Sequence, residues 1–294
     1  MRTFREAMQG DQLTLTAELT LARHSTADDV RRQADVLARY VDGIQVTDNP
    51  YGWVQMSALS AAAILMVHGV DPIPILTCRD RNRIAVESDL LGLRALGVSS
   101  LILTRGQRVP KKHAVQAANV FEISGSELIA LAAGVGEGSE ETPPKPFFIG
   151  TGARVFRPNS GWKAESLAAR AAAGARFLQT QLCFNLDILR EYMQAMVDAK
   201  LTWRYSVIVS LAVLPSAVTA RWVKKNLSDS RIPKPIIQRL EAAPDPAEEG
   251  IRVCAELMQQ VSEIPGVSGI NLMTTGDAAA IPAAIEASGL RNRA

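Results

Sequence analysis

Cysteine and histidine are scarce in this chain, with three residues of each among 294. The cysteines Cys78, Cys183 and Cys254 are far apart and form no CxxC pair, so neither a disulfide framework nor a bound metal is predicted. Aromatic residues make up only 5% of the chain, and the formal net charge of +2 includes no basic block, which argues against a nucleic-acid partner. We therefore expect the partners to be small molecules.

Long apolar runs are also missing, so no membrane span is predicted. The N-terminal segment MRTFREAMQGDQ carries charges where a signal peptide needs its apolar run, and we expect a cytoplasmic protein. Hydrophobic residues still make up 47% of the chain, which is enough for a large core. The composition leaves open whether the protein is a monomer or a homo-oligomer.

The stretch 168–184, AARAAAGARFLQTQLCF, contains a helix end, a turn and a complete strand. Gly174 suits the left-handed residue that ends a helix. The following strand, Phe177–Phe184, carries two amides, Gln179 and Gln181, among apolar residues. Buried amides need hydrogen-bond partners, so these two predict either a polar network or the edge of a ligand site.

Apolar strand patterns alternate with helical patterns along the whole chain, as in a parallel sheet covered by helices. Eight strands are predicted, at Leu13–Thr20, Val41–Asp48, Pro72–Cys78, Ser100–Thr104, Phe147–Gly152, Phe177–Phe184, Tyr205–Leu214 and Val267–Thr274. No GxGxxG follows the first strand and no linker divides the chain, which makes a doubly wound nucleotide-binding fold the weaker alternative. We predict an α/β fold, a (β/α)8 TIM barrel forming a single domain over residues 1–294.

In such a barrel the functional groups lie where strands end. Glu18 stands in an apolar strand, where burial would raise its pKa toward that of a general acid, although an arginine partner is the alternative. The run Leu76–Asn82 (LTCRDRN) is rich in hydrogen-bonding groups and indicates either a salt-bridged loop and helix cap, which we favour, or direct ligand contact. Arg105-Gly106-Gln107 suits a flat heteroaromatic or a phosphate, and Arg105 could equally belong to the barrel rim.

At these strand ends the sequence resembles the methylenetetrahydrofolate reductase family, from about Leu13 to the last helix. The third strand, PILTC, is similar to the family's P-H-L-T-C, and Arg105-Gly106-Gln107 falls on its R-G-D. Leu13–Thr20 is similar to the family's first strand, with Glu18 at the acidic position, and Val46-Thr47 is similar to the end of the second strand. Ala173-Gly174-Ala175, followed by Thr180-Gln181 and Phe184, resembles A-G-A…T-Q-F…F. Leu214-Pro215 resembles the L-P of a late strand.

The resemblance implies an oxidoreductase of one-carbon metabolism and methionine biosynthesis, which reduces 5,10-methylenetetrahydrofolate to 5-methyltetrahydrofolate with NADH or NADPH. Glu18 would be the catalytic acid that helps to open the methylene bridge, and Gln181 would bind the pterin edge. Further residues implied in folate binding are Thr47, Asn49 and Gln107. Those implied in cofactor binding are Thr77, Arg105, Arg154, Arg157 and Arg170, the last in place of a family lysine.

Departures from the family pattern fall on the wall where the family holds FAD. The third-strand histidine is Ile75, the R-G-D aspartate is Gln107, and the family's Y-P-E-x-H-P has become Gly152-Ala153-Arg154-Val155-Phe156-Arg157-Pro158. Three hypotheses follow: a reductase with FAD, a reductase that passes the hydride directly from NAD(P)H to the folate, and a non-catalytic folate-binding relative. Retention of Glu18 beside Gln181 favours a reductase, and the departures favour direct transfer.

Overall fold

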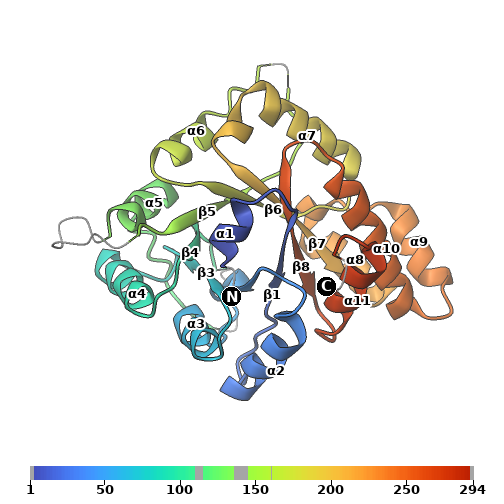
Figure 1. The fold of residues 1–294 in the computed structure, drawn as a ribbon, viewed down its shortest axis with the longest axis horizontal. Coiled ribbons are helices and arrows are strands. Elements are labelled where there is room, and N and C mark those ends of the chain that lie inside the picture. The colour runs from blue at the N-terminus through green and yellow to red at the C-terminus, as the bar shows by residue number, and fades with distance from the viewer. Residues whose placement is uncertain (1–2, 110–114, 136–144, 160, 292–294) are drawn as a thin grey trace.

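The computed structural model describes residues 3–109, 115–135, 145–159 and 161–291. Eight parallel strands close into a barrel in chain order, which confirms the predicted (β/α)8 TIM barrel (Figure 1). The strands are β1 (Thr14–Glu18), β2 (Gly43–Val46), β3 (Pro72–Thr77), β4 (Ser100–Thr104), β5 (Phe148–Ala153), β6 (Phe177–Leu182), β7 (Ser206–Val213) and β8 (Val267–Thr274).

Helices form the outer layer and bury the outward side chains of the strands (Figure 1). Most of these helices follow a capping residue, such as Thr26, Asn82 or Ser124, whose side chain accepts a hydrogen bond from an N–H group of the first turn. These polar caps fix where each helix begins after the preceding strand. The outer helices are α2 (Ala27–Leu37), α3 (Ala58–Val67), α4 (Arg83–Ala95), α5 (Gly125–Gly134), α6 (Glu165–Ala172), α7 (Leu186–Asp198), α8 (Ala217–Asn226), α9 (Lys234–Ala242), α10 (Pro246–Ser262) and α11 (Ala280–Ser288). Short 3-10 turns are η1 (Pro50–Gly52), η2 (Leu201–Trp203) and η3 (Ser228–Ser230).

A short N-terminal helix, α1 (Phe4–Met8), lies at the centre of the ring of strands in Figure 1. Phe4 is fully buried between Phe148 and Phe177, with ring centroids 6.0 and 5.2 Å away. Both rings stand at the first residue of their strands, so α1 closes the amino-terminal end of the barrel. The carboxylate of Asp71, just before β3, accepts the Phe4 N–H bond at 2.7 Å and fixes the helix there.

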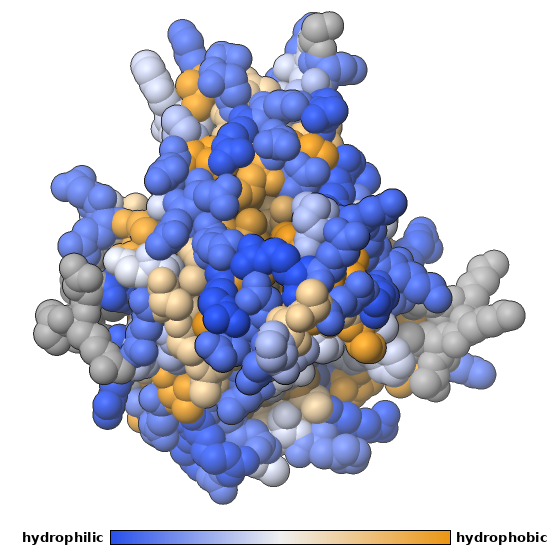
Figure 2. All heavy atoms as spheres, turned by 90° about the vertical axis from the view of Figure 1, so that its right-hand side faces the viewer, coloured by the Kyte–Doolittle hydropathy of each residue, from blue (hydrophilic) through white to orange (hydrophobic). Residues whose placement is uncertain are grey.

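The face over helices α8–α11 is mostly hydrophilic, with smaller apolar patches between the polar side chains (Figure 2). Ion pairs of Arg239 with Glu249 and Glu256 hold α9 to α10 on this side. Among the described helices, none combines the length and the hydrophobicity that crossing a bilayer would require.

Candidate functional site

Glu18 is the last residue of β1, at the carboxyl end of the barrel, in register with Gln45 of β2. Burial raises the pKa of its carboxyl group from 4.5 to about 7. Within the described part of the chain this carboxyl group makes no hydrogen bond or ion pair, so the arginine partner that was the alternative is not seen there. An acid whose pKa lies near neutrality can hold a proton and release it at neutral pH, as general acid catalysis requires.

A polar layer crosses the barrel interior from Gln45, the register partner of Glu18. Gln45 and Gln179 exchange two amide hydrogen bonds, of 2.5 and 2.8 Å. Gln45 also donates to Thr16 Oγ1, which donates to Asn271 Oδ1. Of the two glutamines in β6, Gln179 therefore belongs to a buried polar network, the first of the two predicted alternatives.

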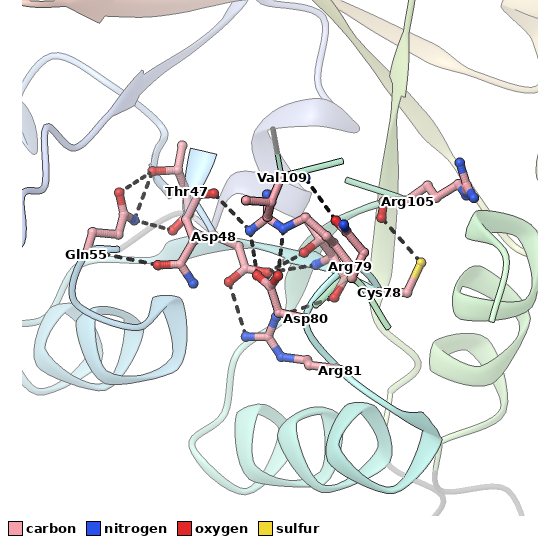
Figure 3. A network of polar contacts seen from close by, with 12 residues as sticks. Thr47, Asp48, Gln55, Cys78, Arg79, Asp80, Arg81, Arg105 and Val109 are labelled. Atoms are coloured by element: carbon pink, nitrogen blue, oxygen red, sulfur yellow. Dashed lines mark hydrogen bonds and ion pairs between the residues drawn. The ribbon is translucent and has the colours of Figure 1, made fainter. Parts of the chain in front are cut away.

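Asp48 joins the ends of β2 and β3 to the start of α4 (Figure 3). Its Oδ2 accepts hydrogen bonds from the N–H and the hydroxyl of Thr77, both at 2.9 Å, and from Arg81 Nη1 at 2.6 Å. Arg81 also pairs with Asp89 of α4, while Asn82 caps that helix. This confirms the predicted salt-bridged loop and helix cap, and the role of Thr77 in cofactor binding stays a prediction.

The loop after β2 contains two of the residues predicted to bind folate. Asn49 Oδ1 accepts the N–H bond of Gln55 at 3.1 Å, and Gln55 Nε2 donates to the carbonyl of Thr47 at 2.6 Å and to its hydroxyl at 3.0 Å (Figure 3). Thr47 and Asn49 thus shape the loop beside Glu18. Their contact with folate remains a prediction.

Arg105 follows β4 and is exposed, with its guanidinium 4.4 Å from the ring centroid of Phe121. Its backbone carbonyl accepts a hydrogen bond from the Cys78 thiol, and its side chain points away from the Asp48 network in Figure 3. Gly106 has a φ of +80°, a conformation that glycine adopts without strain. Gln107 is exposed beyond it. A ligand role for Arg105 and Gln107 is neither required nor prevented by these contacts.

A cavity of about 540 Å³ opens between the β5–α6 loop, α6 and α7. Three aromatic rings line it, Phe156, Trp162 and Tyr192, with centroids 5.5–5.6 Å apart. Three cationic side chains also line it, Arg154, Lys163 and Arg170. Its size falls in the usual range of about 300–1,000 Å³ for ligand sites.

The arginines predicted to bind a cofactor on this side already have protein partners. Arg154 pairs with Asp229 at 2.7 Å, and Arg157, which does not line the cavity, makes a forked pair with Glu191 at 2.6 and 2.9 Å. Arg170 Nη1 donates to a backbone carbonyl of β5 at 2.6 Å. The first two pairs are exposed, and exposed pairs are weak enough to exchange for a phosphate.

Gln181 is held by backbone groups. Its Oε1 accepts the Val155 N–H bond at 2.8 Å, and its Nε2 donates to the carbonyls of Val155 and Asp229 at 3.1 and 3.2 Å. Gln181 therefore ties the end of β5 to η3. In the predicted contact with the pterin edge, Oε1 still has a lone pair to accept a hydrogen bond, whereas Nε2 could donate only if one of its two bonds were exchanged.

Strand order places the candidate residues on two sides of the barrel mouth, because β1 and β5 are opposite in the ring of eight. The first group comes from β1–β3 and their loops and consists of Glu18, Thr47, Asn49 and Thr77. The second comes from β5–β6 and α6 and consists of Arg154, Arg157, Arg170 and Gln181. Arg105 and Gln107 follow β4, between the two groups.

Neither Tyr51 nor the aromatic lining of the cavity was predicted from the sequence. Tyr51 lies in η1, and desolvation together with the charge of Glu18 raises the pKa of its phenol. A tyrosine in a Pro-Tyr-Gly turn shortly after a predicted strand was the available signal. The cavity aromatics come from the β5–α6 loop and from α7, and no local pattern links Tyr192 to Phe156.

Residues 3–289 match the family model for methylenetetrahydrofolate reductase. The chain belongs to the methylenetetrahydrofolate reductase family. A search of curated protein sequences found no match.

Solved structures are similar to this chain in fold. One is described as an uncharacterized protein from Clostridium thermocellum that binds two copies of 5-methyl-5,6,7,8-tetrahydrofolic acid, with a TM-score of 0.64, 11% identity, and coverage of 97% of this chain and 96% of that one. An F420-dependent secondary alcohol dehydrogenase in complex with an F420-acetone adduct has a TM-score of 0.59, 10% identity, and coverage of 96% and 100%. Yersinia pestis DHPS with a pterine-sulfa conjugate has a TM-score of 0.50, 11% identity, and coverage of 95% and 93%.

Proposed function

We propose that this protein reduces 5,10-methylenetetrahydrofolate to 5-methyltetrahydrofolate with NADH or NADPH as the hydride donor. The observation that carries the proposal is Glu18, a carboxyl group with a pKa of about 7 at the barrel mouth that makes no ion pair among the described residues. Membership of the methylenetetrahydrofolate reductase family supports the reaction. The folate described in the Clostridium thermocellum structure supports the substrate class.

In this reaction protonated Glu18 gives its proton to the bridging nitrogen that leaves the methylene carbon, and the C–N bond breaks to give an iminium ion. The nicotinamide transfers a hydride to the methylene carbon, which becomes the methyl group, while the nicotinamide is oxidised. Glu18 then regains a proton from solvent. The overall reaction consumes one proton and one reduced nicotinamide nucleotide.

The nucleotide is assigned to the β5–α6 side of the mouth, opposite Glu18. Arg154, Lys163 and Arg170 line the cavity there, and Lys163 makes no ion pair within the described residues. Ala164 begins α6 without a side-chain cap, so first-turn N–H groups remain for an anion. These groups suit the diphosphate of a dinucleotide.

FAD, the usual cofactor of the family, fits this donor set only in part. The cations would suit its diphosphate, but Ile75 and Gly152 offer no side-chain hydrogen bond to a flavin ring. We therefore favour direct hydride transfer, with the two reacting carbons about 3–3.5 Å apart. An FAD-dependent reductase of the same reaction is the alternative.

The carboxyl group is tested by Glu18→Gln. We expect turnover to fall by roughly 10²–10⁴-fold while folate binding is retained, because the amide keeps the shape of the side chain but cannot donate the proton. Glu87→Gln, at an exposed carboxylate of α4, is the matched control and should leave turnover unchanged. Normal turnover in Glu18→Gln would remove Glu18 from the reaction.

Flavin use is tested by the visible absorption spectrum of the purified protein and by steady-state kinetics with and without added FAD. Direct transfer predicts activity without flavin and intersecting double-reciprocal lines, because both substrates must be bound together. Strict dependence on FAD with parallel lines would identify the alternative, in which a flavin visits each substrate in turn.

A non-catalytic folate-binding protein is the second candidate, since the Clostridium thermocellum structure is described only by its folate ligand. Such a protein would bind 5-methyltetrahydrofolate but would not oxidise NADH or NADPH when methylenetetrahydrofolate is added. Glu18→Gln would then have no turnover to lose.

A further inference from the structure

The loop between β2 and α3 has an unusual backbone beside Glu18. Asn49, Tyr51 and Gly52 all have positive φ angles, of 45°, 57° and 81°. Glycine adopts this conformation freely and asparagine tolerates it, but a bulky side chain such as tyrosine is strained there. Strain of this kind persists only when the surroundings impose it, and it often marks a functional site.

Contacts on both sides of Tyr51 impose this backbone. Arg79, whose side chain is almost fully buried, donates from Nη2 to the Asn49 carbonyl at 3.0 Å. The Asn49 side chain in turn accepts the Gln55 N–H bond at 3.1 Å. Gly52 packs against Val109, since a Cβ at this glycine would lie 3.2 Å from a Val109 methyl group. The loop is therefore fastened before and after the strained tyrosine.

The fastened loop presents Tyr51 at the mouth of the barrel. It leaves β2 beside the end of β1, where Glu18 and Gln45 are register partners. The Tyr51 side chain is 42% exposed and available for contact. Desolvation and the charge of Glu18 both raise the pKa of the Tyr51 phenol, so it stays neutral at physiological pH.

We propose that Tyr51 is a positioning residue for the folate, with its ring forming one wall of the space in which Glu18 meets the substrate. This inference rests on the proposed function. The group that Glu18 protonates belongs to the folate, so a side chain next to Glu18 borders the folate rather than the nicotinamide. The cavity assigned to the nucleotide lies on the other side of the barrel, between the β5–α6 loop, α6 and α7. A flat heteroaromatic substrate is also the chemistry that an exposed aromatic ring binds well.

The decisive variant is Tyr51→Asn, because asparagine keeps the left-handed backbone and removes the ring. We expect an unchanged Tm, a Kd for 5-methyltetrahydrofolate about tenfold higher, and an unchanged Kd for NADH or NADPH. Tyr51→Phe keeps the ring and should restore folate binding. Trp203→Asn removes an aromatic side chain that is 86% exposed in η2, and it should change neither Kd.

Each outcome separates this inference from the proposed function. Wild-type binding of 5-methyltetrahydrofolate with an equal Kd in Tyr51→Asn would overturn the inference alone. An equal loss of folate and nucleotide binding would also overturn it, because a general distortion would explain both. Absence of folate binding in the wild type would overturn the proposed function and this inference with it. If Tyr51→Asn fails to fold, Tyr51→Gly replaces it, since glycine relieves the strain completely, and the same Kd values decide.

Discussion

Glu18 couples the protonation of one side chain to the stability of the fold. Its pKa is about 7 in the folded chain and 4.5 for the free group. Between these two pH values the folded chain keeps the proton, whereas the unfolded chain has already released it. Stability must therefore fall as the pH rises through this window, and the full penalty is present above it. A residue poised for proton donation is in this way destabilising at neutral pH.

The Glu18→Gln variant removes that penalty, because glutamine resembles the neutral acid at every pH. We expect wild type and variant to have similar unfolding free energies near the lower end of the window and the variant to be more stable at about pH 8. Urea unfolding at several pH values measures the difference. A difference that does not change with pH would show that the pKa of Glu18 is the same in the folded and unfolded chains.

Gln181 is expected to contribute to the stability of the fold as well as to folate binding. Gln181→Ala leaves the buried Val155 N–H group without its partner at 2.8 Å. The expected loss of unfolding free energy is about 1–3 kcal/mol, measured by denaturant unfolding. Gln194→Ala, which removes an exposed amide on α7, should cost much less. Separate titrations of the same variant with folate and with NAD(P)H test the predicted pterin contact, for which a selective loss of folate binding is expected.

At the scale of elements, the Asp48 network sets the corner at which β2, β3 and α4 meet. Asp48→Asn removes the charge that buried Asp48 Oδ2 presents to Arg81 and leaves that guanidinium without its inner partner. Breaking a buried pair on one side costs about 3–5 kcal/mol, and we expect thermal or denaturant unfolding to show a loss of this order.

Asp28→Asn is the matched control for this corner. Asp28 pairs with Arg31 on α2, but their side chains are 74% and 49% exposed. An exposed pair contributes about 0–1 kcal/mol, so the control should remain close to wild type. Similar losses in both variants would mean that the Asp48 network adds no special stability.

The regular elements were predictable because each is encoded locally. Ser100–Thr104 and Val267–Thr274 were predicted with the bounds that the structure gives them, as apolar runs between polar or glycine-containing turns. Helix α1 was missed, because five residues are too short to show a helical period and its burial depends on two distant phenylalanines. Its capping box, Thr3 with Glu6, was a visible signal.

The site was less predictable than the fold because its contacts are long-range. The partners of Arg154 and Gln181 include Asp229, which is distant in sequence and lies in η3, and no local period reveals such a contact. The two amides among apolar residues of β6 predicted either a polar network or the edge of a ligand site. That pattern could not show that Gln179 meets Gln45 across the barrel while Gln181 binds backbone groups.

At the scale of the whole molecule, the aromatic cluster at the amino-terminal end of the barrel should stabilise the fold without affecting substrate binding. Phe4→Ala removes a fully buried ring that packs on Phe148 and Phe177. The expected loss is about 3–5 kcal/mol of unfolding free energy, with an unchanged KM for folate because Glu18 is at the opposite end. Calorimetry and steady-state kinetics on the same preparation measure both quantities. A raised KM without a loss of stability would contradict this division.

Helix α1 also confines ligand entry to one end of the barrel. Phe4 and its neighbours close the amino-terminal end and the hydrogen-bonded pair of Gln45 and Gln179 crosses the interior, so the proposed substrates arrive and depart on the side where β1 and β5 end. The folate and the nucleotide are proposed on opposite sides of that mouth, so neither ligand has to pass the other. Either substrate can therefore bind first, and we expect the kinetics to show random rather than ordered binding.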